Sequence, residues 1–238
     1  MDILKIGVVV ADVEEYKHLC ELWASSEIKG EIKIGRDNNT YEIKTDKAEA
    51  RLLCINCGIG KVNAAAAAAH LINLGCSVIL NYGLSGGISG VCRGEIVVAD
   101  RFLEHDFDLT TIGYAPCEKP RQKYIYDADT ALLETVKAVC PEIKCGTAVC
   151  GDRFICSEKD RNFFKDEFEA MSCDMETAAI ASVCDMFGIP FIALRRISDD
   201  AGSEAVDSYN DMNTAGETVL TDVFDKIVKA VINKYQEN

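Results

Sequence analysis

CDMETAAIASVCDMFGIPFIALRRISDDAG, residues 173–202, predicts a helix, a tight turn and a buried strand in succession. Asp174 can cap the helix, because its side chain can accept hydrogen bonds from the free backbone N–H groups of the first turn. Gly188 and Pro190 then end the helix. The apolar run PFIAL is typical of a strand buried on both faces of a sheet, and a polar run, residues 195–200, follows at its carboxyl end, where open α/β sheets bind ligands. The helix face expected to pack on the core consists of Ala179, Ile180, Val183, Met186 and Phe187.

The rest of the chain alternates between strand and helix patterns. Residues 29–57 alternate apolar and polar side chains, which indicates antiparallel strands. Apolar runs predict further strands at residues 5–12, 77–82, 94–100, 145–150 and 169–173. Helices are predicted in residues 57–75, after a glycine turn, at 127–140 and 157–168, and as one long helix from Asp211 onward. We therefore expect one domain over residues 1–238, a three-layer α/β/α fold with a central mixed, largely parallel sheet.

Charge and hydropathy narrow the class of partner. The formal net charge of −14 argues against nucleic acid and against an anionic membrane surface, because both would be repelled. No apolar run reaches the length of a transmembrane helix, and the first residues lack the basic segment of a signal peptide. We expect a cytoplasmic protein that binds a small molecule.

Twelve cysteines are many for 238 residues, but their spacing gives no framework. The only CxxC, Cys54 and Cys57, lies inside a strand-like run, and no second pair completes a zinc site. His105 stands apart from other histidines and is interpreted as a hydrogen-bonding loop residue. We expect reduced, structural cysteines and no zinc site.

Several polar or glycine-rich segments each follow a predicted strand: Glu15, residues 83–87, Phe154, Glu176 and Asp199. If those strands are parallel, these positions share one rim of the sheet. That convergence predicts a binding site.

Each candidate also has a purely structural interpretation. Asp12 and Glu15 have the spacing of a capping box, and Glu176 in a first helical turn is favoured by the helix dipole. Asp199 fits a turn. The run Gly83-Leu84-Ser85-Gly86-Gly87 is interpreted as a turn after its strand, and it is a weak phosphate-loop match without the Walker lysine.

Seven segments, in order along nearly the whole chain, resemble the 5′-methylthioadenosine/S-adenosylhomocysteine nucleosidases of the nucleoside phosphorylase superfamily. The most specific are Met175-Glu176 and Arg195-x-Ile-Ser-Asp199. The others are Glu14-Glu15, residues 57–62, 83–87, 105–110 and 151–155. The resemblance implies hydrolysis of the N-ribosidic bond of purine nucleosides, without metal or cofactor, by a homodimer with shared pockets.

The resemblance also implies a role for each site residue. Asp199 would protonate purine N7, and Glu15 would orient and deprotonate the water. Glu176 would accept hydrogen bonds from the ribose hydroxyls and Met175 would pack on the sugar. Phe154 would stack on the base while the Ile155 backbone reads its edge, with Ser198 beside them. Ile59, and residues near Gly113 and Tyr114 of a partner subunit, would line the pocket for the 5′ substituent.

The chain departs from the family pattern at four positions. Leu84 replaces a serine close to the expected acid, and Asp12 replaces an apolar residue near the 5′ side. Tyr209 stands where phenylalanine would cap the thioalkyl group, and Arg196 replaces a small residue. Two alternatives therefore stay open beside the nucleosidase: a nucleoside phosphorylase of the same fold, and a nucleoside-binding protein without turnover. A phosphorylase needs a pocket for the phosphate dianion, whereas the turn at residues 11–16 offers acids.

Overall fold

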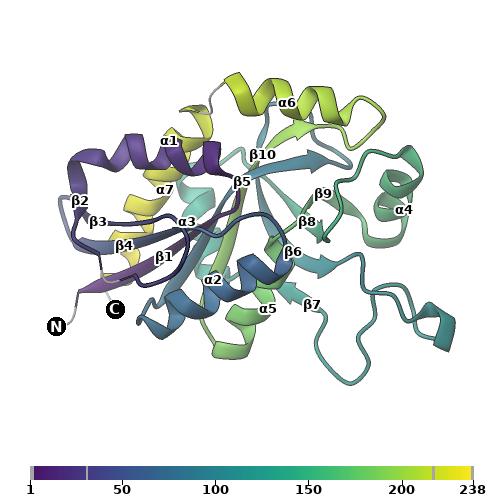
Figure 1. Cartoon of the computed structure of the whole chain (residues 1–238), viewed down its shortest axis with the longest axis horizontal. Coiled ribbons are helices and arrows are strands. Elements are labelled where there is room, and N and C mark those ends of the chain that lie inside the picture. The colour runs from purple at the N-terminus through teal and green to yellow at the C-terminus, as the bar shows by residue number, and fades with distance from the viewer. Residues whose placement is uncertain (1–2, 31, 216–217, 237–238) are drawn as a thin grey trace.

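The computed structural model describes residues 3–30, 32–215 and 218–236 (Figure 1). Its strands are β1 (Leu4–Val10), β2 (Glu27–Ile28), β3 (Asn38–Lys44), β4 (Glu49–Asn56), β5 (Val78–Gly87), β6 (Ile96–Glu104), β7 (Ile125–Asp127), β8 (Lys144–Cys150), β9 (Ala170–Asp174) and β10 (Phe191–Asp199). Its α-helices are α1 (Val13–Trp23), α2 (Lys61–Asn73), α3 (Thr130–Val139), α4 (Glu158–Phe168), α5 (Thr177–Phe187), α6 (Ala205–Ala215) and α7 (Thr218–Gln236).

The described strands form one mixed sheet, in the order β10-β6-β8-β9-β5-β1-β4-β3-β2, with β7 paired to β6. Strands β1, β4, β5 and β10 run parallel where they pair, and so do β6, β8 and β9. Strand β10 pairs with β5 as well as with β6, so the sheet closes on itself through β5, β10, β6, β8 and β9. Within this closed part of the sheet, β10 runs antiparallel to β6, and β5 runs antiparallel to β9.

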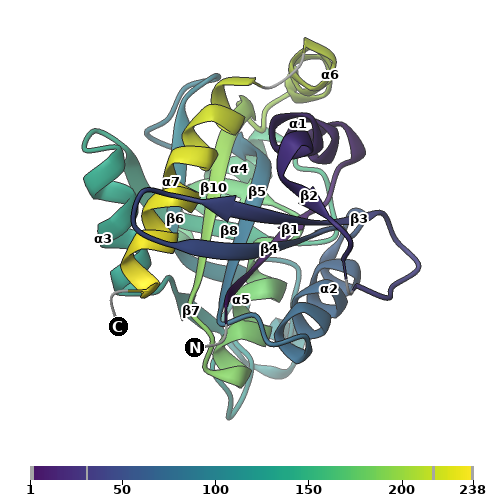
Figure 2. The ribbon, with the colours of Figure 1, turned by 90° about the vertical axis from the view of Figure 1, so that its left-hand side faces the viewer.

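Helices cover both faces of the sheet (Figure 2). One apolar core joins the sheet to α1, α3 and α7 through side chains such as Leu19, Val136 and Phe224. A second core, on the opposite face, joins it to α2 and α5 through Ala68, Leu71 and Ile180. The alanines of α2 let this helix approach the sheet closely, because they carry no bulk beyond Cβ. The predicted three-layer α/β/α fold is confirmed.

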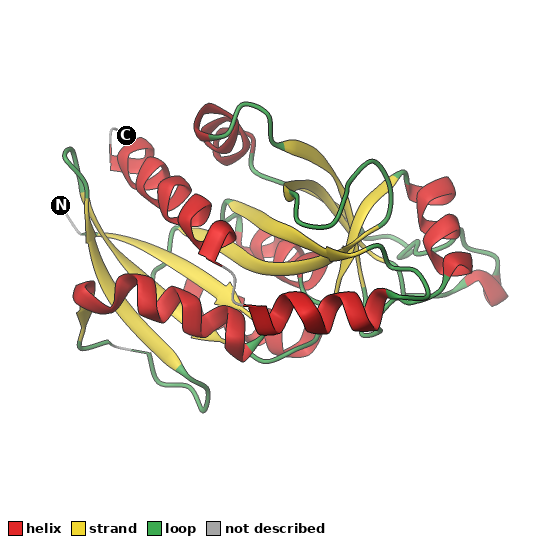
Figure 3. Ribbon diagram, turned by 90° about the horizontal axis from the view of Figure 1, so that it is seen from above, coloured by secondary structure: helices red, strands yellow, loops and turns green. Residues whose placement is uncertain are grey.

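Three local predictions are wrong. The glycine segment at residues 83–87 is not a turn but the end of β5, because β10 pairs along it and β9 pairs at Gly86 and Gly87. The polar run after PFIAL likewise continues β10 as far as Asp199. The single long helix from Asp211 is two helices, α6 and α7, whose axes point in different directions (Figure 3).

The last turn of α5 also differs from the expectation. Ala179 and Ile180 are buried, but Met186 is 77% exposed and Phe187 is 47% exposed. The last turn of α5 extends past the part of the helix that packs on the sheet. The apolar periodicity of the sequence continues into this exposed turn. Asp174 does cap this helix: its Oδ1 accepts hydrogen bonds from the N–H groups of Glu176 and Thr177, at 2.9 and 2.8 Å.

All twelve cysteines lie in the described residues and are free, most of them buried. Among the described residues, no helix has the length and apolar character needed to cross a membrane.

Candidate active site

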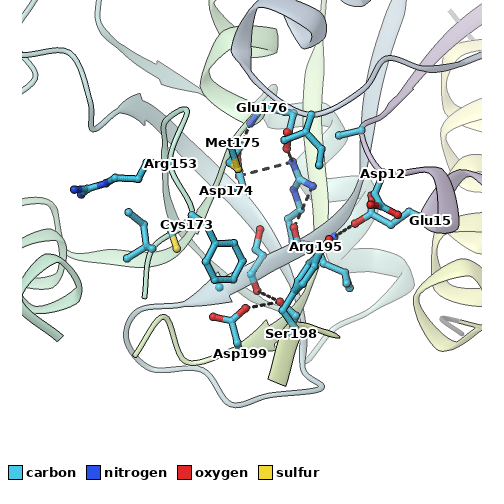
Figure 4. A pocket seen from close by; sticks show the side chains of 18 residues that line it. Asp12, Glu15, Arg153, Cys173, Asp174, Met175, Glu176, Arg195, Ser198 and Asp199 are labelled. Carbon is cyan, nitrogen blue, oxygen red and sulfur yellow. Dashed lines mark hydrogen bonds and ion pairs between the residues drawn. The ribbon is translucent and has the colours of Figure 1, made fainter. Parts of the chain in front are cut away.

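A cavity of about 330 Å³ opens at the carboxyl ends of β1, β5, β9 and β10. Figure 4 shows Asp12 and Glu15 on one side of it and Asp199 and Cys173 on the other. Every site residue predicted from the sequence lines this cavity: Asp12, Glu15, Ile59, Leu84, Phe154, Ile155, Met175, Glu176, Ser198, Asp199 and Tyr209. The predicted convergence on one rim is therefore observed, while the role of each residue stays a prediction.

Glu15 is buried at the start of α1, with 6% of its surface exposed. Its Oε1 accepts a hydrogen bond of 2.7 Å from the backbone N–H of Leu84 in β5. Burial raises the pKa of Glu15 to about 8, although Arg195 and the Leu84 N–H oppose the rise. Asp12 and Glu176 add to it by their negative charge. A carboxylate with this pKa is a stronger base than an exposed one.

Arg195 is the most deeply buried charge of the site, at 1% exposure. Its Nη2 lies 3.8 Å from Oδ2 of Asp174 and 3.7 Å from Oε2 of Glu176, and its Nη1 donates to the carbonyl of Leu84 at 3.3 Å. Oε1 of Glu176 accepts from the Gly60 N–H at 3.0 Å. The guanidinium therefore holds two buried carboxylates in place, and Glu176 keeps a fixed orientation toward the cavity.

Two glycines of β5 make room for these charges. A Cβ at Gly83 would lie 2.5 Å from Nη1 of Arg195 and 2.8 Å from Oε2 of Glu15. A Cβ at Gly86 would lie 2.9 Å from Sγ of Cys173 and 3.0 Å from Oδ1 of Asp199. The glycine-rich segment therefore lets charged side chains approach the backbone of a strand closely. It forms neither a turn nor a phosphate loop.

Asp199 ends β10 and is 2% exposed. Its Oδ2 accepts from the Ser198 hydroxyl at 2.7 Å and its Oδ1 from the Ala201 N–H at 2.8 Å. Burial raises the pKa of Asp199, although both hydrogen bonds favour the ionised form and lower it. The turn interpretation and the functional interpretation both apply, since one oxygen closes a turn while the carboxyl group faces the cavity.

The remaining walls are apolar or aromatic. Phe154 is 39% exposed at the cavity mouth, and its ring packs against Tyr209 of α6 at a centroid distance of 5.6 Å. Ile155 and Leu84 are buried, and Ile59 is 53% exposed. Arg196 points elsewhere, because its Nε donates to the Gly94 carbonyl at 3.0 Å and it is absent from the lining.

The capping-box interpretation explains Asp12 but not Glu15. Oδ1 of Asp12 accepts from the Glu14 N–H at 2.8 Å, as an N-cap does. Glu15 bonds to Leu84 in β5 and not to the Asp12 N–H, so the capping box is incomplete. His105 also differs from the expected hydrogen-bonding residue: its ring packs on Phe164 at 4.6 Å, and no described residue bonds its Nε2.

Three lining residues had no role in the sequence interpretation: Arg153, Cys173 and Arg195. Arg195 had a detectable signal, because a charge inside an apolar strand requires buried partners. Cys173 had none, since a small buried thiol looks like core. Among the described residues, no group of three or more histidine, cysteine or acidic side chains could hold a metal ion.

Comparison with known proteins decides the family. The sequence profile of the Phosphorylase superfamily matches residues 5–233. The chain belongs to this superfamily.

Within the superfamily, the chain is 37% identical over 174 residues to the 5′-methylthioadenosine/S-adenosylhomocysteine nucleosidase of Geobacillus thermodenitrificans, which covers 70% of the chain and 73% of that relative. It is 31% identical over 208 residues to the aminodeoxyfutalosine nucleosidase of Campylobacter jejuni, covering 85% and 88%. A crystal structure of the Helicobacter pylori 5′-methylthioadenosine/S-adenosylhomocysteine nucleosidase, in complex with a pyrrolidine inhibitor, superposes with a TM-score of 0.87 at 25% identity, covering 96% and 99%. The resemblance to these N-ribosyl hydrolases is confirmed.

Proposed function

We propose that the protein hydrolyses the N-ribosidic bond of adenine nucleosides with a 5′-thio substituent, 5′-methylthioadenosine and S-adenosylhomocysteine first among them. The observation that carries the proposal is one cavity with Glu15 and Asp199 on different sides and Glu176 fixed between other polar groups. The similarity to nucleosidases along most of the chain supports the same activity. The products are adenine and a 5-thioribose derivative.

Asp199 is the proposed general acid. As the C1′–N9 bond breaks, its electron pair passes into the purine, and a proton from the Asp199 carboxyl to N7 neutralises the developing charge. The acid must be protonated before the step, and burial, which raises the pKa of Asp199, favours that form. The Ser198 hydroxyl fixes the position of the carboxyl group.

Glu15 is the proposed general base. The sugar acquires oxocarbenium character, and a water attacks C1′ from the face opposite the leaving base while its proton passes to Glu15. The Leu84 N–H holds Oε1 of Glu15, which leaves Oε2 to bind the water. Negative charge from Glu15 and Glu176 also stabilises the cationic sugar.

The other lining residues bind the substrate. Glu176 accepts hydrogen bonds from the ribose 2′- and 3′-hydroxyls, and Met175 packs on the sugar. Phe154 stacks on the purine and the Ile155 backbone reads its edge. Ile59, Leu84 and Tyr209 complete the walls, so that the cavity encloses a nucleoside with few polar contacts at fixed positions.

Two other activities of the superfamily compete with this one. Phosphorolysis would place a dianion next to Glu15, Glu176 and Asp12, and Arg195, the buried cation there, is already paired with two carboxylates. The relative in Campylobacter jejuni makes hydrolysis of aminodeoxyfutalosine a second candidate.

The test is release of the purine base, which is hypoxanthine for inosine and adenine for the others, in phosphate-free buffer from 5′-methylthioadenosine, S-adenosylhomocysteine, adenosine and inosine. Aminodeoxyfutalosine is assayed in the same way. The proposal expects release from the two thio-nucleosides. Tight binding without release from any of the four would establish the binding-protein alternative instead. Release only from aminodeoxyfutalosine would establish the second candidate.

A homodimer in the cytoplasm completes the proposal. Ile59 lines the cavity yet is 53% exposed, and Ile112, next in sequence to Gly113 and Tyr114, is 69% exposed. A partner subunit covering such side chains would remove apolar surface from water and close the pocket for the 5′ substituent. Light scattering at several protein concentrations tests the dimer.

A further inference from the structure

The cavity holds more negative charge than the proposed reaction uses. Among the described residues that line it, five carry carboxyl groups and two carry guanidinium groups. Arg195 is committed to Asp174 and Glu176, and Arg153 pairs with Asp160 at 3.2 Å. Asp12 has no role in bond cleavage and no cation to balance it.

Asp12 is half-buried at the N-cap of α1. One carboxylate oxygen, Oδ1, is occupied by the Glu14 N–H at 2.8 Å. No donor in the described part of the chain reaches the other oxygen, and no described cation lies within ion-pair distance of it. A half-buried carboxylate oxygen on the cavity wall, without a partner among the described residues, can accept a hydrogen bond from a donor on the ligand.

The position of Asp12 relates it to one part of a bound nucleoside. In Figure 4 it lies beside Glu15, on the side of the cavity away from Asp199 and apart from Glu176. With the purine at Asp199 and the 2′- and 3′-hydroxyls at Glu176, the sugar edge that remains for Asp12 is the one carrying the 5′ carbon.

Tyr209 supports a polar character at the same place. Its ring contacts Phe154 at the cavity mouth. Burial raises the pKa of the Tyr209 hydroxyl, and negative charge raises it further, that of Asp12 more than that of any other carboxylate of the cavity. Both residues line the same cavity, so a phenol and a carboxylate can face one ligand.

We propose that Asp12 is a specificity-determining residue that selects nucleosides whose 5′ substituent carries a hydrogen-bond donor, a positively charged ammonium most strongly. This inference rests on the proposed function for the orientation of the nucleoside. Asp12 accepts the donor through its free oxygen and repels a 5′ carboxylate or phosphate. A charge pair formed at about 4 Å near a protein surface contributes several kcal/mol, enough to change relative affinities by a hundredfold or more.

The experiment compares three nucleosides that differ at the 5′ carbon: 5′-amino-5′-deoxyadenosine, 5′-methylthioadenosine and adenosine-5′-carboxylic acid. For the unsubstituted protein, we expect kcat/KM for the amine to exceed that for the carboxylic acid by about a hundredfold. Asp12→Asn and Asp12→Ser both keep an N-cap side chain and remove the charge. Each should reduce this ratio at least tenfold, mainly by raising KM for the amine and lowering it for the acid.

Asp129→Asn is the matched control, because Asp129 caps α3 through the Leu132 N–H at 2.9 Å and is absent from the cavity lining. For this control, the ratio of kcat/KM for the amine to kcat/KM for the carboxylic acid should equal that of the unsubstituted protein. An unchanged ratio in both Asp12 variants would overturn the inference. If none of the three nucleosides releases adenine, the proposed function fails, and the same ratio taken from calorimetric dissociation constants then decides the inference by the same criterion.

Discussion

Glu15 begins α1 and Leu84 lies within β5, yet Oε1 of Glu15 accepts a 2.7 Å hydrogen bond from the Leu84 backbone N–H. This contact turns the carboxylate away from its own helix and into the cavity. It exists because β5 carries glycine at position 83, where any Cβ would displace Glu15 and Arg195. The position of the Glu15 carboxylate therefore depends on the β5 segment beneath it.

Gly83→Ala should remove activity and lower stability. The added methyl group would lie 2.5 Å from Nη1 of Arg195, so the guanidinium and its two carboxylate partners must shift. We expect kcat to fall by about a hundredfold or more, because misplacement of catalytic groups by an ångström has that effect. Gly35→Ala is the control, since nothing lies within 4 Å of its added Cβ. Equal activity of the two variants would show that the spacing at residue 83 is unimportant.

Glu15→Gln should lose turnover and gain stability at alkaline pH. The pKa of Glu15 rises from 4.5 when unfolded to about 8 when folded, so between these values the folded protein binds the additional proton. Its stability therefore falls as pH rises toward 8, whereas a glutamine pays no ionisation penalty. We expect the variant to be more stable than the unsubstituted protein by on the order of 5 kcal/mol at pH 9, and by much less at pH 5.

Urea unfolding at pH 5 and pH 9 measures this difference. The same pKa predicts that kcat/KM of the unsubstituted protein falls as pH drops below about 8, because the base becomes protonated. A glutamine variant that is less stable than the unsubstituted protein at pH 9 would show that Glu15 is ionised without cost.

Asp199→Asn should lower kcat by about 10²–10⁴-fold while leaving nucleoside binding within a few-fold. The amide preserves the shape: its oxygen can still accept from the Ala201 N–H, and its NH2 group can donate to the Ser198 hydroxyl. It cannot protonate N7. Asp200→Asn is the neighbouring control: its side chain is 63% exposed and pairs with Arg161 at 3.7 Å. Near-normal turnover of Asp199→Asn would mean that another group is the acid.

Arg195→Met should lower the free energy of unfolding by about 3–5 kcal/mol, because it leaves Asp174 and Glu176 buried without a counter-charge. Arg196→Gln, which loses one hydrogen bond to Gly94, should cost only about 1 kcal/mol. Chemical denaturation of the two variants compares these values. Equal losses of stability in the two variants would show that the ion pairs of Arg195 with Asp174 and Glu176 do not stabilise the folded protein.

The layers of the fold and the place of the site could be predicted from the sequence, whereas the geometry of individual segments was predicted less well. Burial leaves a pattern in neighbouring residues of the sequence. The apolar run at residues 190–194 predicted a buried strand in this way, and the apolar stripe of α7 predicted a helix packed on the core. The pairing of β10 with both β5 and β6 depends on contacts between residues about a hundred positions apart, such as Arg195 with Gly83. For that reason the glycine segment was interpreted as a turn, and the closure of the sheet was not predicted.

The cluster around Arg195 shows the same limit. The sequence interpretation placed Arg195 in a polar run after the strand and assigned it no partner, and only the three-dimensional arrangement identifies Asp174 and Glu176. The end of α5 shows the opposite error: periodicity predicted burial of Met186, whose side chain is 77% exposed among the described residues.

The central claim is that water, not phosphate, attacks the sugar. The measurement is the rate and the sugar product of 5′-methylthioadenosine turnover in phosphate-free buffer and in buffer with saturating phosphate. The account predicts equal rates and free 5-methylthioribose in both. A rate that vanishes without phosphate, together with 5-methylthioribose 1-phosphate as the product, would contradict it.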